Sequence, residues 1–266
     1  MNKRPDGYHN INTVFYPIDI FDLIELKSNE NDNTISVEVE GMNIPEEDNL
    51  VFKAAKKLQK KSNTSKGVSI KLTKNIPSGA GLGGGSANAA VILLALKSIW
   101  KLDVSNNELF IIATSLGADV PFFLRKGAAE GKSRGERLNY LNYLMPFKVA
   151  VVNPGLHIST PEAYKALDRD ESPKPSLKIP DILYRSMDNP SLLASYLKND
   201  FEDYAFSKYP EIEYIKKQLY KEGAAFALMS GSGSSVFGLF EEDFDFSRLK
   251  NTFSDYKVMI ENKEVT

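Results

Sequence analysis

The chain has 266 residues, 42% of them apolar, and its 33 basic and 35 acidic side chains give a net charge of −2. It has no cysteine and two histidines, which excludes disulfides and a cysteine nucleophile and leaves little for a Ser-His-Asp triad or a multi-histidine metal site. The balanced charge and the shortness of the longest apolar run, residues 89–96, predict a cytoplasmic protein without nucleic-acid or membrane partners.

Polar and apolar side chains alternate in three stretches of the first third of the chain, which predicts half-buried strands. These stretches are residues 21–26, 35–39 and 68–72. The Asn-rich residues 28–33 predict a hairpin-like turn between the first two. Residues 50–61 have helical spacing and follow a suitable N-cap, Asp48 or Asn49.

A glycine-rich segment comes next, with five glycines in residues 79–85. Such density has a large entropic cost, so the fold must require it. Without Cβ atoms, consecutive N–H groups can converge on one anion, and the following helix, predicted over residues 87–100 as buried on all sides, adds its positive dipole end. Ser86 stands where a helix cap would. The segment therefore predicts phosphate binding.

Three other interpretations of this segment fit less well. A Walker A loop needs Lys after G-x-x-x-x-G, where this chain has Gly85. A dinucleotide fingerprint is met by Gly79, Gly81 and Gly84, but it also needs a second parallel strand, and the chain predicts a helix over residues 106–116 instead. A flexible hinge does not need this many glycines.

The second half of the chain predicts a fresh alternation of strands and helices. The expected strands are residues 148–152, 225–229, 236–240 and 256–260, and the expected helices are residues 191–198, 210–220 and 244–253. Thr160 before Pro161 looks like a helix N-cap. The proline-rich residues 173–190 predict a loop or lid, and residues 230–235 form a second glycine turn.

Residues 77–90, P-S-G-A-G-L-G-G-G-S-A-N-A-A, resemble the signature loop of the GHMP kinases, small-molecule kinases without a Walker A loop. Three more segments agree with this family and follow its order. They are R-P-D-G-Y-H at residues 4–9, L-G-A-D-V-P-F-F at 116–123 and M-S-G-S-G-S-S at 229–235. The first is typical of members that act on a cytidine diphosphate derivative.

The resemblance implies an α+β fold of two domains, an ATP-binding domain over residues 1–144 and a C-terminal domain over 145–266, with the active site in the cleft between them. It implies transfer of a phosphate from ATP, assisted by Mg²⁺, to the 2-hydroxyl of 4-diphosphocytidyl-2-C-methyl-D-erythritol in the non-mevalonate isoprenoid pathway. We expect a monomer or a weak homodimer. Two alternatives stay open: a kinase of homoserine or mevalonate, or a non-catalytic nucleotide-binding relative.

Asp119 is the expected catalytic base, because an alcohol must lose its proton as it attacks phosphorus. The family's base is the Asp of its G-A-D-x-P motif, and Asp119 stands there among apolar neighbours. From the residues alone, a helix cap or a salt-bridged turn is also open for Asp119.

The resemblance also assigns binding residues. For ATP they are Pro77, Ser78, Gly79, Ala80, Gly81, Leu82, Gly83, Gly84, Gly85, Ser86 and Ala87, with Asn49 and Lys74 near the base. For the substrate they are Tyr8 and Tyr164 on the two faces of the cytosine, His9 at its edge, Phe15 lining the pocket and Thr160 beside the diphosphate. Residues 230–235 would bind phosphate through backbone N–H groups or form a tight turn. His157 receives no role.

Family members carry a strand with P-A-K-[IL]-N-L ahead of the G-Y-H motif, and its Lys pairs with the catalytic Asp. This chain begins Met1-Asn2-Lys3 and lacks that motif. Lys3 cannot be assumed to replace the family's catalytic Lys. We expect a shortened chain rather than an inactive kinase, because the other motifs are intact.

Overall fold

The computed structural model describes residues 2–5, 7–40, 45–167 and 178–261. Their contacts divide the chain into two units. Unit 1 comprises Met1–Ile20, Gly79–Leu82 and Gly127–Thr266, and unit 2 comprises Phe21–Ser78 and Gly83–Lys126.

This grouping does not follow the expected division between residues 144 and 145. Ala128 and Tyr143, before that point, are buried in the same apolar cluster as Phe147 and Val149, after it. A division there would cut through a hydrophobic core. The 144/145 division therefore stays a prediction about domains along the chain, and the two units are described by their contacts.

Unit 2 contains a three-stranded sheet in the order β3-β5-β4. Its strands are β3 (Leu23–Asn29), β4 (Ile35–Glu40) and β5 (Gly67–Thr73). The expected hairpin between the first two is wrong, because β3 pairs antiparallel and β4 parallel with β5, and not with each other. The reason lies in β5, whose apolar side chains Val68, Ile70 and Leu72 are all buried and favour the central position.

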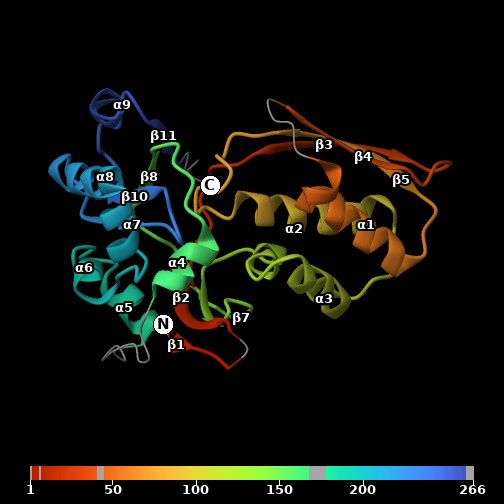
Figure 1. Ribbon diagram of the computed structural model, residues 1–266, viewed down its shortest axis with the longest axis horizontal. Coiled ribbons are helices and arrows are strands. Elements are labelled where there is room, and N and C mark those ends of the chain that lie inside the picture. Colours follow the sequence, from red (N-terminus) through yellow and green to blue (C-terminus); the bar gives the residue numbers. More distant parts are fainter. Residues whose placement is uncertain (1, 6, 41–44, 168–177, 262–266) are drawn as a thin grey trace. The chain divides into compact units, whose positions relative to one another are not determined.

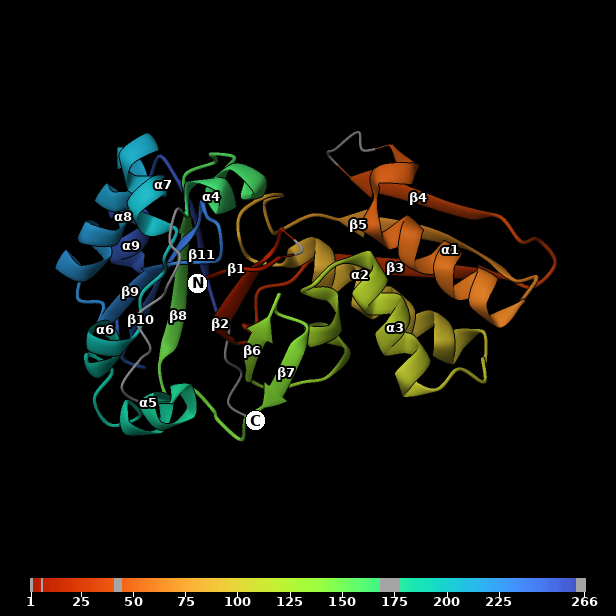
Figure 2. The same ribbon diagram turned by 60° about the horizontal axis from the view of Figure 1, so that its bottom comes forward.

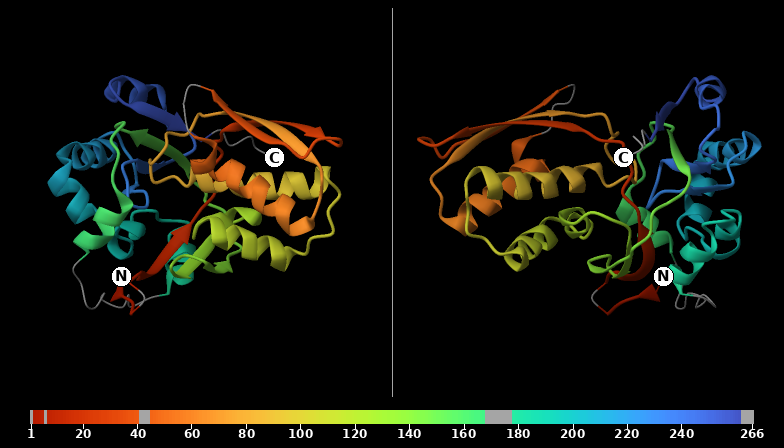
Figure 3. Two further views of the ribbon diagram at one scale, coloured as in Figure 1. Left: turned by 45° about the vertical axis from the view of Figure 1, so that its right-hand side comes forward. Right: turned by 180° about the vertical axis from the view of Figure 1, so that it is seen from behind.

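Three helices lie on one face of this sheet: α1 (Leu50–Ser62), α2 (Gly84–Ile99) and α3 (Asn106–Leu116) (Figures 1 and 3). Two short 3-10 turns, η1 (Glu46–Asp48) and η2 (Val120–Leu124), complete the unit. The expectation that the second helix is buried all round is wrong, since Val91, Leu94 and Ile99 are at least 40% exposed. The core instead takes one side of α2, including Ala89, Leu93 and Leu96.

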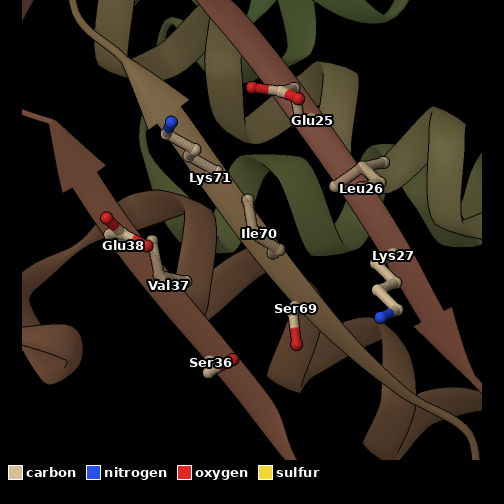
Figure 4. Close-up of a pocket in the computed structure, with 9 residues that line it drawn as sticks. All are labelled: Glu25, Leu26, Lys27, Ser36, Val37, Glu38, Ser69, Ile70 and Lys71. Atoms are coloured by element: carbon tan, nitrogen blue, oxygen red, sulfur yellow. The ribbon is translucent and has the colours of Figure 1, made fainter.

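The opposite face of the sheet is polar (Figure 4). There Lys71 of β5 stands in register between Glu25 of β3 and Glu38 of β4. A shallow hollow of about 520 Å³ lies over these side chains, and it contains no residue that the sequence analysis assigned to a site.

Unit 1 contains two antiparallel sheets, in the orders β1-β2-β6-β7 and β11-β8-β10-β9. The first consists of β1 (Asn2–Lys3), β2 (His9–Phe15), β6 (Ala129–Ser133) and β7 (Arg137–Tyr140). The second consists of β8 (Lys148–Asn153), β9 (Phe226–Met229), β10 (Val236–Phe240) and β11 (Lys257–Ile260). The four strands of the second sheet match expectation, whereas the β6–β7 hairpin was not foreseen.

The helices of unit 1 are α4 (Thr160–Ala166), α5 (Ile179–Arg185), α6 (Leu192–Tyr196), α7 (Glu202–Lys208), α8 (Pro210–Lys221) and α9 (Ser247–Thr252). Helix α8 packs on β9 and β10 (Figure 2). Helix α5 corrects the expected loop or lid over residues 173–190, of which 173–177 lie outside the described residues. Among the residues that the structure describes, no helix has the length and apolar character required to cross a membrane.

Candidate active site

The glycine-rich loop leads directly into helix α2 of unit 2. The helix begins at Gly84, and Gly83 takes the N-cap position with φ 67° and no side chain to cap it. Ser86 therefore lies inside the first turn of α2, and the prediction that it takes the cap position is wrong. Because no side chain caps the helix, the N–H groups and the positive dipole end of its first turn favour an anion there.

Close packing explains the glycines at the start of α2. A Cβ atom on Gly84 would lie 3.1 Å from Cγ2 of Ile76, and one on Gly83 would lie 3.1 Å from Cζ of Phe123. A larger residue at either position would require the Ile76 or Phe123 side chain to shift, and at Gly83 it would also have to adopt a left-handed backbone.

In unit 1, the first half of the loop contacts the second glycine turn. The hydroxyl of Ser230 donates to the carbonyl oxygen of Gly81 at 2.8 Å, and the backbone N–H of Ser235 donates to that of Ala80 at 3.1 Å. A Cβ atom on Gly81 would lie only 2.1 Å from the carbonyl oxygen of Ser230. The two glycine-rich segments thus touch through their backbones.

These contacts bear on the expected anion nest at residues 230–235. The N–H groups of Ser230, Gly233 and Ser235 already donate to protein carbonyls. A tight turn describes the segment well, and phosphate binding by its other N–H groups stays a prediction.

Two asparagines that the sequence analysis missed hold this turn. The side-chain amide of Asn199 donates to the carbonyl oxygens of Met229 and Gly231, both at 2.7 Å. The amide of Asn153 donates to the hydroxyl of Ser235 at 3.0 Å. Their partners lie 30 or more positions away in the chain, so no local pattern could have revealed them.

Thr160 also reaches this turn. Its hydroxyl is 2.9 Å from that of Ser232. The N-cap of α4 is Ser159, whose hydroxyl accepts from the N–H of Glu162, so the expected capping role of Thr160 is wrong. Contact of Thr160 with a diphosphate stays a prediction.

His157, which had no predicted role, lies against the start of the loop. A Cβ atom on Gly79 would be 2.6 Å from Nδ1 of this exposed imidazole.

The structure brings two predicted substrate residues together. The rings of His9 and Tyr164 are 5.2 Å apart, and Phe201 meets Tyr164 edge-on at 4.9 Å. The ring of Tyr8 is 56% exposed, and the guanidinium of Arg134 lies 4.8 Å from its centroid. Arg134 and Phe201 were not foreseen, since both act through contacts distant in the sequence.

Phe15 lies elsewhere. It is six residues beyond His9 on β2, roughly 20 Å along an extended strand. Its ring covers Gly131 of β6, where a Cβ atom would approach Cε2 of Phe15 to 2.5 Å. The role of Phe15 in lining a pocket stays a prediction.

Asp119 follows α3 in unit 2. It takes the N-cap position of η2, but its side chain makes no capping bond, and no ion pair of its carboxylate is found among the described residues. The capping and salt-bridge interpretations are therefore wrong. Asp119 is an exposed residue, but the protein atoms around its carboxyl group displace part of the water that would hydrate it, and this desolvation raises the pKa of the carboxyl.

Asn49 and Lys74, the two residues expected near the nucleotide base, both have partners in unit 2. The side-chain oxygen of Asn49 accepts from the N–H of Val51 at 2.9 Å and caps α1. The ammonium of Lys74 pairs with the carboxylate of Asp22. Contact of either residue with ATP stays a prediction.

Sequence comparison matches two segments of the chain to family models. The profile of the GHMP kinases N terminal domain matches residues 49–127, and that of the GHMP kinases C terminal matches residues 182–257. A 4-diphosphocytidyl-2-C-methyl-D-erythritol kinase of Chlorobium phaeobacteroides is 44% identical over 259 residues, 96% of this chain and 88% of that relative. The chain belongs to the 4-diphosphocytidyl-2-C-methyl-D-erythritol kinases of the GHMP family.

Solved structures agree with this membership. The crystal structure of a 4-(cytidine 5'-diphospho)-2C-methyl-D-erythritol kinase matches with a TM-score of 0.82 at 34% identity, over 97% of this chain and 92% of that chain. A homoserine kinase from Cytophaga hutchinsonii, 19% identical, shares the fold with a TM-score of 0.69 over 94% and 88% of the two chains. The expected family and α+β GHMP fold are thereby confirmed.

Proposed function

We propose that this GHMP kinase transfers the γ-phosphate of ATP to the 2-hydroxyl of 4-diphosphocytidyl-2-C-methyl-D-erythritol. Its membership of the kinases named for that substrate supports the reaction class. The observation that carries the chemistry is the Asp119 carboxylate, which lies in the same unit as the uncapped start of α2 and lacks a partner among the described residues.

In the proposed step, the substrate hydroxyl oxygen attacks the γ-phosphorus and forms the new O–P bond. The bond from that phosphorus to the β–γ bridging oxygen breaks, and ADP leaves. The hydroxyl proton goes to the carboxylate of Asp119. Because desolvation raises the pKa of Asp119, its carboxylate is a stronger base than a fully hydrated one, and turnover should fall as the pH drops through that raised pKa.

The start of α2 and residues 79–82 would hold the phosphates of ATP through backbone N–H groups. Among the described residues no cluster of three His, Asp or Glu side chains offers a complete metal cage. Mg²⁺ binds through one or two protein ligands plus phosphates, and the Ser86 hydroxyl in the first turn of α2 fits such a role. Bound there, Mg²⁺ would neutralise charge on the phosphates; Ala87 offers no second hydroxyl.

Unit 1 would recognise the cytidine. His9 and Tyr164 already pack together, and the exposed ring of Tyr8 can stack on a pyrimidine. Homoserine and mevalonate have no base for such a surface to bind.

The test combines binding with turnover. We expect calorimetry to detect cytidine diphosphate and a non-hydrolysable ATP analogue binding to the same chain. Asp119→Asn should abolish turnover while leaving both affinities within about twofold, because it removes the base and no binding group. Turnover is measured with the 266-residue chain and with the same chain extended by the family's P-A-K-[IL]-N-L strand.

Asp103→Asn is the matched control, since Asp103 is an exposed residue of the same unit before α3. It should leave turnover unchanged. Full activity of Asp119→Asn would remove Asp119 from the mechanism. Binding of ATP without cytidine diphosphate, together with turnover of homoserine or mevalonate, would assign the chain to another kinase of the family.

A further inference from the structure

A carboxylate outside the predicted site, that of Asp22, is fully buried in unit 2 just before β3. One oxygen accepts the backbone N–H groups of Asn75 and Ile76 at 2.7 and 2.8 Å. The other accepts from the ammonium of Lys74 and from the side-chain amide of Asn88, the latter at 2.8 Å. Four donors from two separate segments therefore converge on this one side chain.

These donors stand on both sides of the glycine-rich loop. Lys74, Asn75 and Ile76 precede it, and Asn88 lies in the second turn of α2, which follows it. The chain leaves this cluster, passes through residues 77–83 and returns to it. Asp22 thus fixes the two ends of the loop relative to each other.

The contact extends to the start of α2. Ile76, whose N–H is held by Asp22, places its side chain against Gly84, where a Cβ atom would lie 3.1 Å from Cγ2 of Ile76. Asn88 is four residues beyond Gly84, on the same side of the helix. A shift of Asp22 would therefore move both the first turn of α2 and the residue packed against it.

The charge of Asp22 matters for this arrangement. Burial alone would raise its pKa, but the hydrogen bonds from Ile76, Lys74 and Asn88 outweigh it and lower the pKa. The group is thus a carboxylate at neutral pH, and the nearby ammonium of Lys74 compensates its charge. An uncharged replacement would leave Lys74, whose side chain is 10% exposed, without a counter-charge.

We propose that Asp22 is a positioning residue for the nucleotide, which sets the geometry of the phosphate-binding loop through Asn75, Ile76 and Asn88. The proposal rests on the proposed function for the identity of the ligand. In this positioning role Asp22 contacts no phosphate; it holds the donors of α2 where the phosphates bind.

The test is Asp22→Asn, measured by calorimetry with a non-hydrolysable ATP analogue and, separately, with cytidine diphosphate. The amide fits the space but turns an N–H₂ toward Lys74 or Asn88, so two donors face each other. We expect the ATP analogue to bind at least about tenfold more weakly, and cytidine diphosphate to bind within about twofold of the parent.

Ser105→Ala is the matched control. Ser105 belongs to the same unit and caps α3 by accepting from the N–H of Glu108 through its hydroxyl, so its loss weakens α3 without touching the loop. We expect this variant to lower the melting temperature and keep the affinity for the ATP analogue. Equal loss of that affinity in both variants would overturn the proposal, because general destabilisation would then explain it.

Unchanged affinity of folded Asp22→Asn for the ATP analogue would also overturn the proposal, and would leave the proposed function standing. Failure of the parent chain to bind any adenine nucleotide would instead refute the proposed function. If Asp22→Asn does not fold, Asn88→Leu is the second variant. It removes one of the four donors to Asp22 and keeps the buried ion pair of Asp22 with Lys74. That variant should weaken binding of the ATP analogue while cytidine diphosphate binds as before, and unchanged binding would count against Asp22.

Discussion

Three glycines of unit 1 have nearly the same left-handed backbone but different neighbours. Gly79, Gly81 and Gly155 have φ values of +68°, +75° and +73°. A Cβ atom would meet the exposed imidazole of His157 at Gly79, the backbone carbonyl of Ser230 at Gly81, and nothing within 4 Å at Gly155. Alanine substitutions at these three glycines therefore separate two free-energy costs, that of the left-handed backbone and that of a steric clash.

We predict that Gly155→Ala costs about 1 kcal/mol, the price of the left-handed conformation alone. Gly79→Ala should cost little more, because the exposed His157 side chain can turn away. Gly81→Ala should cost more than about 3 kcal/mol, since a backbone carbonyl 2.1 Å away cannot yield without separating the two glycine-rich segments. Urea unfolding at pH 7 measures all three. Equal losses for Gly79→Ala and Gly81→Ala would show that the close approach to Ser230 does not exist.

At the residue scale, the sequence was a better guide to candidate residues than to the side chains that they contact. It predicts roles for Asp119 and the glycines because their motif is local, and those roles stay predictions. It did not foresee that Lys74 pairs with Asp22, 52 residues away, because no pattern along the chain records such a contact. The same holds for Arg134 over Tyr8.

At the scale of the elements, helix α1 is preceded by an N-cap residue, Asn49, that has two candidate roles. Asn49 caps the helix through its side-chain oxygen, while its amide N–H₂ is the group that could contact ATP. Serine also caps a helix well but has no amide. The two roles can therefore be separated by substitution.

We predict that Asn49→Ala lowers the free energy of unfolding by about 1 kcal/mol, whereas Asn49→Ser keeps it within about 0.3 kcal/mol. If the amide contacts the nucleotide as predicted, Asn49→Ser should still weaken binding of an ATP analogue several-fold. Urea unfolding and calorimetry give the two readouts. Parent-like binding by Asn49→Ser would restrict Asn49 to the cap.

Strongly periodic elements were predictable from the sequence, and irregular ones were not. Helix α3 has the predicted limits, since Ser105 and Glu108 form a capping box before an apolar run. Strand β6 was missed because its sequence, A-E-G-K-S, has neither alternation nor β-branched residues. Its buried positions come from pairing with β2, more than 100 residues earlier.

At the scale of the whole molecule, the units differ in how much of the chain each requires. The hydrophobic cluster of unit 2 runs from Ile24 to Leu124 and lies entirely between the two outer segments of unit 1. Unit 1 combines residues from both ends of the chain.

We predict that a fragment of residues 21–126 unfolds cooperatively on heating, because it contains this cluster complete. A fragment of residues 145–266 should bind a hydrophobic dye and unfold without cooperativity, since it lacks Ala128 and Tyr143 of its own core. Circular dichroism and dye fluorescence measure both. Cooperative unfolding of the second fragment alone would favour the 144/145 division over the division by contacts.

The division of the chain into units 1 and 2 also determines which part can fold first during synthesis. Strand β2 leaves the ribosome early and can pair with β1, but its other neighbour, β6, begins at Ala129, so one edge of β2 emerges long before it can pair. Unit 2 is complete in the meantime. A nascent chain that pauses after residue 126 has emerged, but before β6 has, would therefore present a complete unit 2 together with an unpaired edge of β2, a form on which a chaperone that shields strand edges would act.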